Sequence, residues 1–153
     1  MSGKKGQQAM EWYAESKGWT KITTIGHPFA NGIDGIFWDP AESKYIFLEA
    51  KETIGKGNYE KKLSKGASYG DQMSDDWLRH HVDELYKNGL DSQTYRELKD
   101  SIDSGTAKKQ VVIYRTSGFS GRTITKGFAD DLNNIGPLDK SKINDVIIIG
   151  SGG

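Results

Sequence analysis

Two apolar segments joined by a short polar turn constrain the fold of this chain more than any other feature. The first reads IDGIFWD and covers Ile33 to Asp39, and the second reads YIFLEAK and covers Tyr45 to Lys51. The residues DPAES lead from one segment to the other, and proline, aspartate and serine are typical of turns. The pattern predicts a β-hairpin whose loop is slightly longer than the tightest type.

The second strand of this hairpin ends in two opposite charges. Side chains alternate between the faces of a strand, so Glu49 and Lys51 are expected on the same face as Tyr45 and Phe47. The other face carries Ile46, Leu48 and Ala50, which can pack against a helix. In the ordinary hairpin register the turn centres near residues 40–42, and Asp34 of the first strand then falls opposite Glu49.

The rest of the chain predicts a mixed α/β domain with helices flanking a sheet. Further strands are expected at Thr20–Gly26, Gln110–Thr116 and Asn144–Gly150, of which the last two are apolar enough for burial on both faces. Helices are expected at Gln7–Lys17 before Gly18, within 72–89 up to Gly89, and at about Ser92–Ser104. Ser74 and Asp75 are expected to cap the second helix. Three tryptophans are expected in the core, namely Trp12, Trp19 and Trp77.

Composition limits the classes of protein that fit. With 153 residues and no internal repeat or linker, the chain is expected to form a single domain over 1–153. There is no long apolar run, so neither a transmembrane helix nor a secretory signal is predicted. The absence of cysteine excludes disulfides and thiolate metal sites. The formal net charge is +0, so binding to nucleic acid would have to use a local basic patch.

Asp34, Glu49 and Lys51 are residue types suited to metal-assisted phosphodiester hydrolysis. Two neighbouring carboxylates repel unless a cation lies between them, and Mg²⁺ is typically held by one or two carboxylates together with water and phosphate oxygens. A bound metal can activate water for attack on phosphate, and a neighbouring lysine can orient that water or neutralise developing charge. The competing interpretation is a surface ion pair between Glu49 and Lys51, which would contribute little.

The three-letter pattern Glu-x-Lys has little meaning by itself. It also occurs at Glu60–Lys62, in a polar segment, and at Glu97–Lys99, in a predicted helix where residues two apart do not face each other. Only Glu49 and Lys51 end a strand that follows another strand carrying an aspartate. This context selects the first occurrence.

The stretches GIDGIF and YIFLEAK resemble the core motif of PD-(D/E)xK nucleases, which have the restriction-endonuclease-like fold. Asp34, Glu49 and Lys51 match the motif, although Ile33 stands where the motif has its nominal proline. The stretch KGQQAMEWYAESKGW is similar to the first helix of that family. The resemblance implies an acidic metal ligand there, for which Glu11 is the first choice and Glu15 the second.

The segment QMSDDWL is similar to one found in nuclease domains at the C-termini of bacterial polymorphic toxins, including contact-dependent growth inhibition and Rhs-type toxins. The resemblance spans roughly residues 5–85 and suggests a nuclease core at about 5–88, followed by C-terminal strands and a helix at 90–150. It implies a C-terminal fragment of a secreted or cell-surface toxin that acts in the cytoplasm of a target cell. It also implies a cognate immunity protein as partner, and no membrane-embedded part.

The expected activity is therefore that of a metal-dependent endonuclease. Asp34, Glu49 and Glu11 would bind the metal, with Mg²⁺ expected first and Mn²⁺ or Zn²⁺ as alternatives, and Lys51 would position the water. DNA is the favoured substrate and tRNA the alternative. A junction-resolvase-like or repair nuclease and a non-catalytic nucleic-acid-binding module are the competing classes. Candidate substrate contacts are Lys56, Lys61, Lys62, Lys65, Gln72 and His27.

Overall fold

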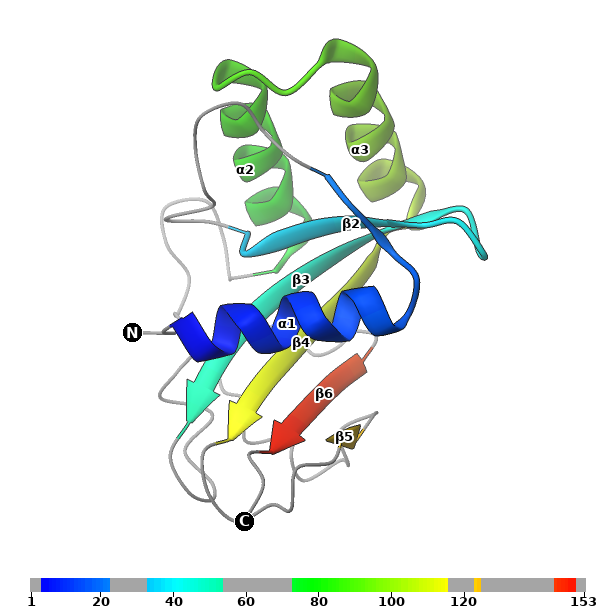
Figure 1. Ribbon diagram of the computed structural model, residues 1–153. Coiled ribbons are helices and arrows are strands. Elements are labelled where there is room, and N and C mark those ends of the chain that lie inside the picture. Colours follow the sequence, from blue (N-terminus) through cyan, green and yellow to red (C-terminus); the bar gives the residue numbers. More distant parts are fainter. Residues whose placement is uncertain (1–3, 23–32, 54–72, 116–122, 125–144, 151–153) are drawn as a thin grey trace.

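The computed structural model describes residues 4–22, 33–53, 73–115, 123–124 and 145–150 (Figure 1). Its elements follow the order α1 (Lys4–Ser16), β1 (Thr20–Lys21), β2 (Gly35–Asp39), β3 (Lys44–Thr53), α2 (Asp75–Lys87), α3 (Ser92–Ser104), β4 (Lys108–Arg115), β5 (Thr123–Ile124) and β6 (Asp145–Gly150). Over the described ranges the strands form one sheet in the order β1-β2-β3-β4-β6-β5. The predicted α/β class is confirmed.

The predicted hairpin is present in the predicted register. β2 and β3 pair antiparallel from Gly35 opposite Leu48 to Asp39 opposite Lys44. Asp39 stabilises the turn, since its Oδ1 accepts hydrogen bonds from the backbone N–H groups of Ala41 at 2.9 Å and Glu42 at 3.3 Å. This is the local aspartate turn that the sequence DPAES favours.

β3 lies in the interior of the sheet, between an antiparallel and a parallel neighbour. β4 runs parallel to it, with Val111 opposite Glu49 and Ile113 opposite Lys51. β6 continues the parallel part beside β4, and the two-residue strand β5, which the sequence patterns did not predict, pairs antiparallel with β6. The chain crosses from β3 to β4 through α2 and α3, because parallel neighbours cannot be joined by a tight turn.

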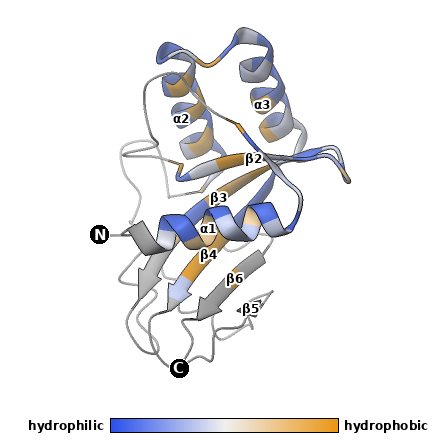
Figure 2. Cartoon of the chain, in the orientation of Figure 1, coloured by the Kyte–Doolittle hydropathy of each residue, from blue (hydrophilic) through white to orange (hydrophobic). Residues whose placement is uncertain are grey.

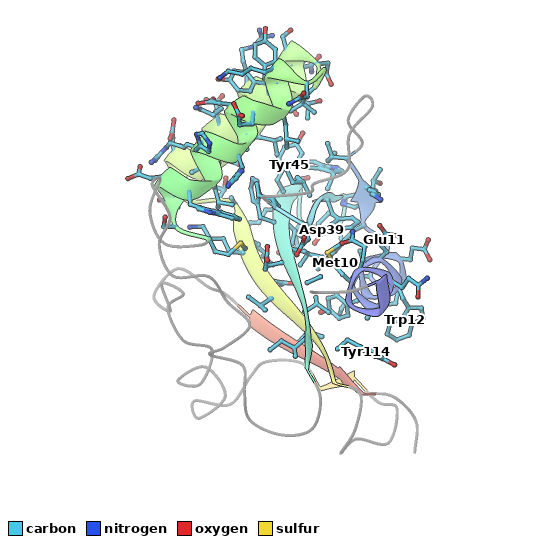
Figure 3. The ribbon with its side chains drawn as sticks, turned by 90° about the vertical axis from the view of Figure 1, so that its left-hand side faces the viewer. Met10, Glu11, Trp12, Asp39, Tyr45 and Tyr114 are labelled. Atoms are coloured by element: carbon cyan, nitrogen blue, oxygen red, sulfur yellow. The ribbon has the colours of Figure 1, made fainter. Side chains whose placement is uncertain are left out.

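The two faces of the sheet carry separate hydrophobic clusters, as strand alternation predicts. One face of β3 contributes Ile46, Leu48 and Ala50, which pack with Met10 and Ala14 of α1. Figure 3 shows α1 on the side of the sheet opposite to α2 and α3. The hydropathy colours of Figure 2 fit this arrangement, with hydrophobic stretches along β2 and β4 and mixed colours along the helices.

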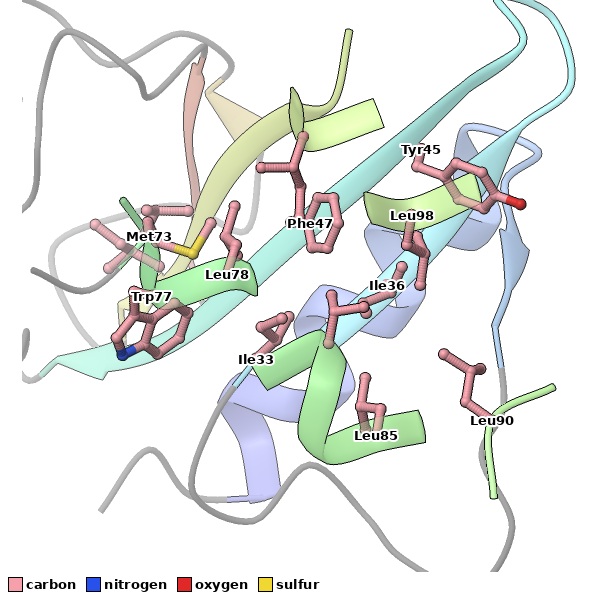
Figure 4. Packing of buried hydrophobic residues seen from close by; sticks show 14 residues of the cluster. Ile33, Ile36, Tyr45, Phe47, Met73, Trp77, Leu78, Leu85, Leu90 and Leu98 are labelled. Carbon is pink, nitrogen blue, oxygen red and sulfur yellow. The ribbon is translucent and has the colours of Figure 1, made fainter. Parts of the chain in front are cut away.

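The other face packs against α2 and α3. Figure 4 shows Phe47 of β3 surrounded by Ile36, Leu78 and Leu98, which come from β2 and the two helices. Phe47, Leu78 and Leu98 are each 0% exposed. Complete burial of an aromatic side chain contributes on the order of 2–3 kcal/mol to folding. This cluster fixes the helical layer on the face that also carries Glu49.

The helix boundaries agree closely with the signals in the sequence. α3 has the predicted bounds, and α2 begins at Asp75, with Ser74 as its N-cap accepting a hydrogen bond from the N–H of Trp77 at 3.3 Å. Gly89 follows α2 with a φ of 113°, a conformation that favours glycine. α1 starts earlier than predicted, at Lys4 instead of Gln7.

One expectation from the sequence is wrong, and another concerns residues that lie partly outside the described ranges. Trp12 was expected in the core but is 54% exposed, because it lies on the side of α1 that faces away from the sheet. Trp77 is buried as expected. The strand expected at Thr20–Gly26 is present at Thr20–Lys21, and its continuation from residue 23 lies outside the described residues. Among the described helices, none has the length and apolar character that crossing a membrane requires.

Candidate active site at the end of β3

Asp34 is hydrogen-bonded to the C-terminal half of β3. Its Oδ2 accepts a hydrogen bond from the backbone N–H of Ala50 at 2.7 Å. The β2–β3 ladder ends with Gly35 opposite Leu48, so the Asp34 carboxylate takes the position where the next backbone acceptor would lie. The prediction that Asp34 lies across from the end of YIFLEAK is confirmed, and the contact fixes its carboxylate beside the residue that follows Glu49.

Glu49 is a buried acid. Only 3% of it is exposed, and its place in β3 is opposite Val111, a residue of the cluster beneath α2 and α3. Moving a carboxylate out of water is costly unless a cation or hydrogen-bond donors compensate its charge. A buried glutamate whose neighbour in the strand, Ala50, holds a second carboxylate is therefore suited to binding a cation, and unsuited to the exposed ion pair considered as the alternative.

Lys51 continues β3 two positions after Glu49. Its backbone lies opposite Ile113 in the ladder with β4, and its side chain is outside the described part of the structure. The strand extends to Thr53, two residues beyond the predicted end. The backbone position expected for Lys51 is therefore present, and its role stays a prediction.

Glu11 is held by a different partner. Its Oε2 lies 2.8 Å from Lys21 Nζ in an ion pair with side chains 39% and 43% exposed. The hydrogen bond from Lys21 lowers the pKa of Glu11, partly against the effect of burial. In the described ranges no three His, Asp or Glu side chains group closely enough to hold a metal ion. The structure thus brings Asp34 to the end of β3 beside Glu49 but leaves Glu11 with Lys21.

Gln7 connects Glu11 to Asp34. Its Nε2 donates to Glu11 Oε2 and to the backbone carbonyl of Asp34, both at 3.3 Å. The sequence reasoning missed this glutamine, because a polar residue near the start of a helix carries no specific signal. Gln7 places Glu11 one side chain away from Asp34, and the proposed metal role of Glu11 remains a prediction.

Lys109 and Asp75 were also missed as a pair. Lys109 is 5% exposed in β4, and its Nζ lies 2.5 Å from Asp75 Oδ1 at the start of α2. A lysine at the start of an apolar strand is typical of a solvated strand end. Asp75 was predicted only to cap its helix. The sequence could have given one signal, since strand alternation places Lys109 on the same face as Val111 and Ile113.

The remaining predicted contacts lie outside the described residues. These are Lys56, Lys61, Lys62, Lys65, Gln72 and His27. Comparisons of the chain with protein-family models, curated proteins and solved structures found no match.

The residues at the end of β3 fit a hard divalent cation. Asp34 and Glu49 supply carboxylate oxygens, which Mg²⁺ and Mn²⁺ prefer as ligands. A carboxylate has about four lone-pair positions, and the hydrogen bond from Ala50 uses one of those of Asp34. A site of thiolate ligands is excluded, because the chain has no cysteine.

Proposed function

We propose that this protein is a metal-dependent endonuclease that hydrolyses phosphodiester bonds, with DNA as its first substrate class. One observation carries the proposal: the carboxylate of Asp34 accepts a hydrogen bond from Ala50 N–H, and Ala50 directly follows the buried acid Glu49 on a strand that continues to Lys51. An acid pair followed by a lysine on one strand is a set of groups that can support metal-dependent phosphodiester hydrolysis.

Each residue has a separate role in the proposed reaction. Asp34 and Glu49 would hold the divalent cation, Mg²⁺ in the first instance, and their fixed positions would orient the scissile phosphate. The cation would supply Lewis-acid stabilisation of charge on the phosphate together with a water of lowered pKa. Lys51 would donate a hydrogen bond to the attacking water or to a phosphate oxygen and so offset negative charge in the transition state. Glu11 is the proposed auxiliary ligand, and it would have to leave Lys21 to act.

The finer assignment to the restriction-endonuclease-like fold and the PD-(D/E)xK nucleases belongs to the same proposal. Its support is a mixed sheet with helices on both faces, in which the hairpin carries Asp34, Glu49 and Lys51 at corresponding positions. The similarity of QMSDDWL to toxin nuclease domains supports action in the cytoplasm of a target bacterium. A cognate immunity protein is the proposed partner, and the parent toxin would be secreted or displayed at the cell surface.

The test is cleavage by the purified protein. Supercoiled plasmid and total cellular RNA are incubated with Mg²⁺, Mn²⁺ or Zn²⁺ in separate reactions, and the products are followed on gels. Plasmid cleavage that disappears with a chelator is expected, and discrete tRNA fragments would assign the tRNA alternative. If neither nucleic acid is cleaved with any of these metals, the proposal is wrong.

Variants can separate chemistry from folding. Glu49→Gln and Lys51→Ala are expected to lose at least about a hundredfold in cleavage rate, a usual loss for removing one electrostatic catalytic group. Glu97→Gln is the matched control, because Glu97 and Lys99 repeat the Glu-x-Lys pattern on α3. An amide at position 97 can still accept the hydrogen bond from Tyr45. Normal cleavage by Glu49→Gln would reject the assigned site.

A further inference from the structure

An ion pair between a buried lysine and a partly exposed aspartate lies on the same face of the sheet as Glu49. Lys109 Nζ lies 2.5 Å from Asp75 Oδ1, and the exposed fractions of the two side chains are 6% and 33%. Asp75 is in the first turn of α2, directly after the N-cap Ser74. The pair therefore joins the beginning of α2 to the beginning of β4 across the helical layer.

The ladder places Lys109 diagonally beside Glu49. Lys109 is opposite Phe47, and Val111 is opposite Glu49. Side chains two positions apart share a face of a strand, and Val111 belongs to the cluster under α2 and α3. Neighbouring strands are about 4.8 Å apart and two residues span about 6.6 Å, so the Cα atoms of Lys109 and Glu49 are about 8 Å apart. The flexible lysine chain can bridge most of such a separation.

The ion pair between Lys109 and Asp75 is not explained by its contribution to folding stability. An ion pair that buries a charge commonly gives no more stability than well-packed apolar residues of similar volume, because desolvation offsets the attraction, and here the Lys109 ammonium is the buried charge. β4 continues with Val111, Val112 and Ile113, all of which are buried. An apolar residue at position 109 would fit this strand equally well. The lysine instead brings a permanent positive charge into the low-dielectric layer that contains Glu49.

We propose that Lys109 is a positioning residue whose positive charge changes the electrostatic potential at Glu49. Through this potential it would change the affinity of the acid pair, Asp34 and Glu49, for a divalent cation. The ammonium of Lys109 attracts both Asp75 and Glu49. The negative charge of Asp75 therefore partly cancels the electrostatic effect of Lys109 on the acid pair. This inference rests on the proposed metal site. It predicts opposite effects for removing the two members of the pair.

Removing Lys109 should strengthen metal binding and removing the Asp75 charge should weaken it. Lys109→Met takes a positive charge away from the acid pair, whereas Asp75→Asn removes a negative charge that offsets the charge of Lys109. Taking the Cα separation of about 8 Å as the distance between a unit charge and a divalent cation, an effective dielectric constant of about 20 gives a change in Kd of up to about a thousandfold, so each variant should shift Kd by at least about tenfold. The double variant Lys109→Met/Asp75→Asn removes the pair without changing the net charge, so its Kd should stay near that of the wild type.

The experiment is calorimetric titration of the full chain with Mn²⁺, for the wild type, both single variants and the double variant. Urea unfolding of each checks that it is folded, and Asp75→Asn should be less stable than the double variant, because it removes a charge that compensates the buried ammonium of Lys109. The expected order of Kd is Lys109→Met below wild type, double variant near wild type, and Asp75→Asn above wild type. If Lys109 has only a structural role, all three variants should weaken Mn²⁺ binding, and that result would overturn the inference.

The same titration separates this inference from the proposed function. A wild-type protein that neither binds Mn²⁺ nor cleaves nucleic acid would contradict both. Wild-type binding with shifts in the same direction for both single variants would contradict the role of Lys109 alone. Wild-type binding with opposite shifts, but without cleavage of DNA or RNA, would leave the role of Lys109 supported and reject the nuclease.

Discussion

Replacing Asp34 with alanine should weaken the fold as well as the proposed chemistry. Oδ2 of Asp34 accepts the hydrogen bond from Ala50 N–H at 2.7 Å, and Ala50 is 0% exposed. Alanine at position 34 removes this acceptor and leaves a buried donor unsatisfied, which costs about 1–3 kcal/mol. For a chain of this size, each kcal/mol lowers the melting temperature by about 2–4 °C.

Asparagine at the same position separates stability from charge. Its side-chain oxygen can still accept the hydrogen bond from Ala50, so the loss is limited to the difference between a charge-assisted and a neutral hydrogen bond, about 1 kcal/mol. Both variants lose the charge of Asp34, one of the three carboxylates proposed to bind the metal. We expect both to be inactive, with Asp34→Ala more destabilised than Asp34→Asn.

Urea unfolding followed by circular dichroism measures the stabilities, with similar m-values required for the comparison. Cleavage of plasmid DNA measures the activities at a temperature where all three proteins are folded. An Asp34→Ala protein within about 0.5 kcal/mol of the wild type, the range of ordinary surface substitutions, would refute the contact with Ala50. An Asp34→Asn protein with full nuclease activity would refute the catalytic assignment and leave the structural role in place.

Three further predictions concern the framework around the site. Gly35→Ala should cost about 1–3 kcal/mol in urea unfolding through overpacking, because the added Cβ would lie 2.7 Å from Cε1 of the Phe37 ring and 2.8 Å from Met10 Cε; unchanged stability would contradict this close packing around Gly35. Phe47→Ala should cost about 3–5 kcal/mol, since this side chain is 0% exposed, and a loss below about 1 kcal/mol would contradict its central position. Tyr45→Phe removes the 2.6 Å hydrogen bond that the Tyr45 hydroxyl donates to Glu97. In the wild type this hydrogen bond lowers the pKa of the Glu97 carboxyl below 4.5. The stability difference from wild type should therefore be complete above pH 4.5 and shrink as the pH falls through the lowered pKa; a difference independent of pH would argue against the bond.

The hairpin was predictable because its information is local. Strand alternation assigned Glu49 to one face of β3, and the turn residues centred the register so that Asp34 falls at the end of the ladder. α3 was predictable for a similar reason, since Asp91 caps its start and Gly105, with a φ of 77°, ends it. Such signals act between residues close in sequence and need no knowledge of the rest of the fold.

Elements that depend on distant partners were not predictable. β5 consists of Thr123–Ile124 and is a strand only through its pairing with β6. Trp12 was assigned to the core from its residue type, yet the side of α1 that faces the sheet is the one carrying Met10 and Ala14. Helical periodicity indicates which residues share a side, but the packing of α1 on β3 decides where that side points.

The sequence by itself determined the α/β class, the hairpin and the placement of Asp34 and Glu49 at one strand end, because periodicity and turn chemistry fix these locally. Only the tertiary structure decided that Glu11 pairs with Lys21 and that Lys109 is buried against Asp75. A charged side chain has the same sequence signal whether it is solvated or enclosed. Its environment is set when β4 crosses back beside β3 and α2 closes over both strands.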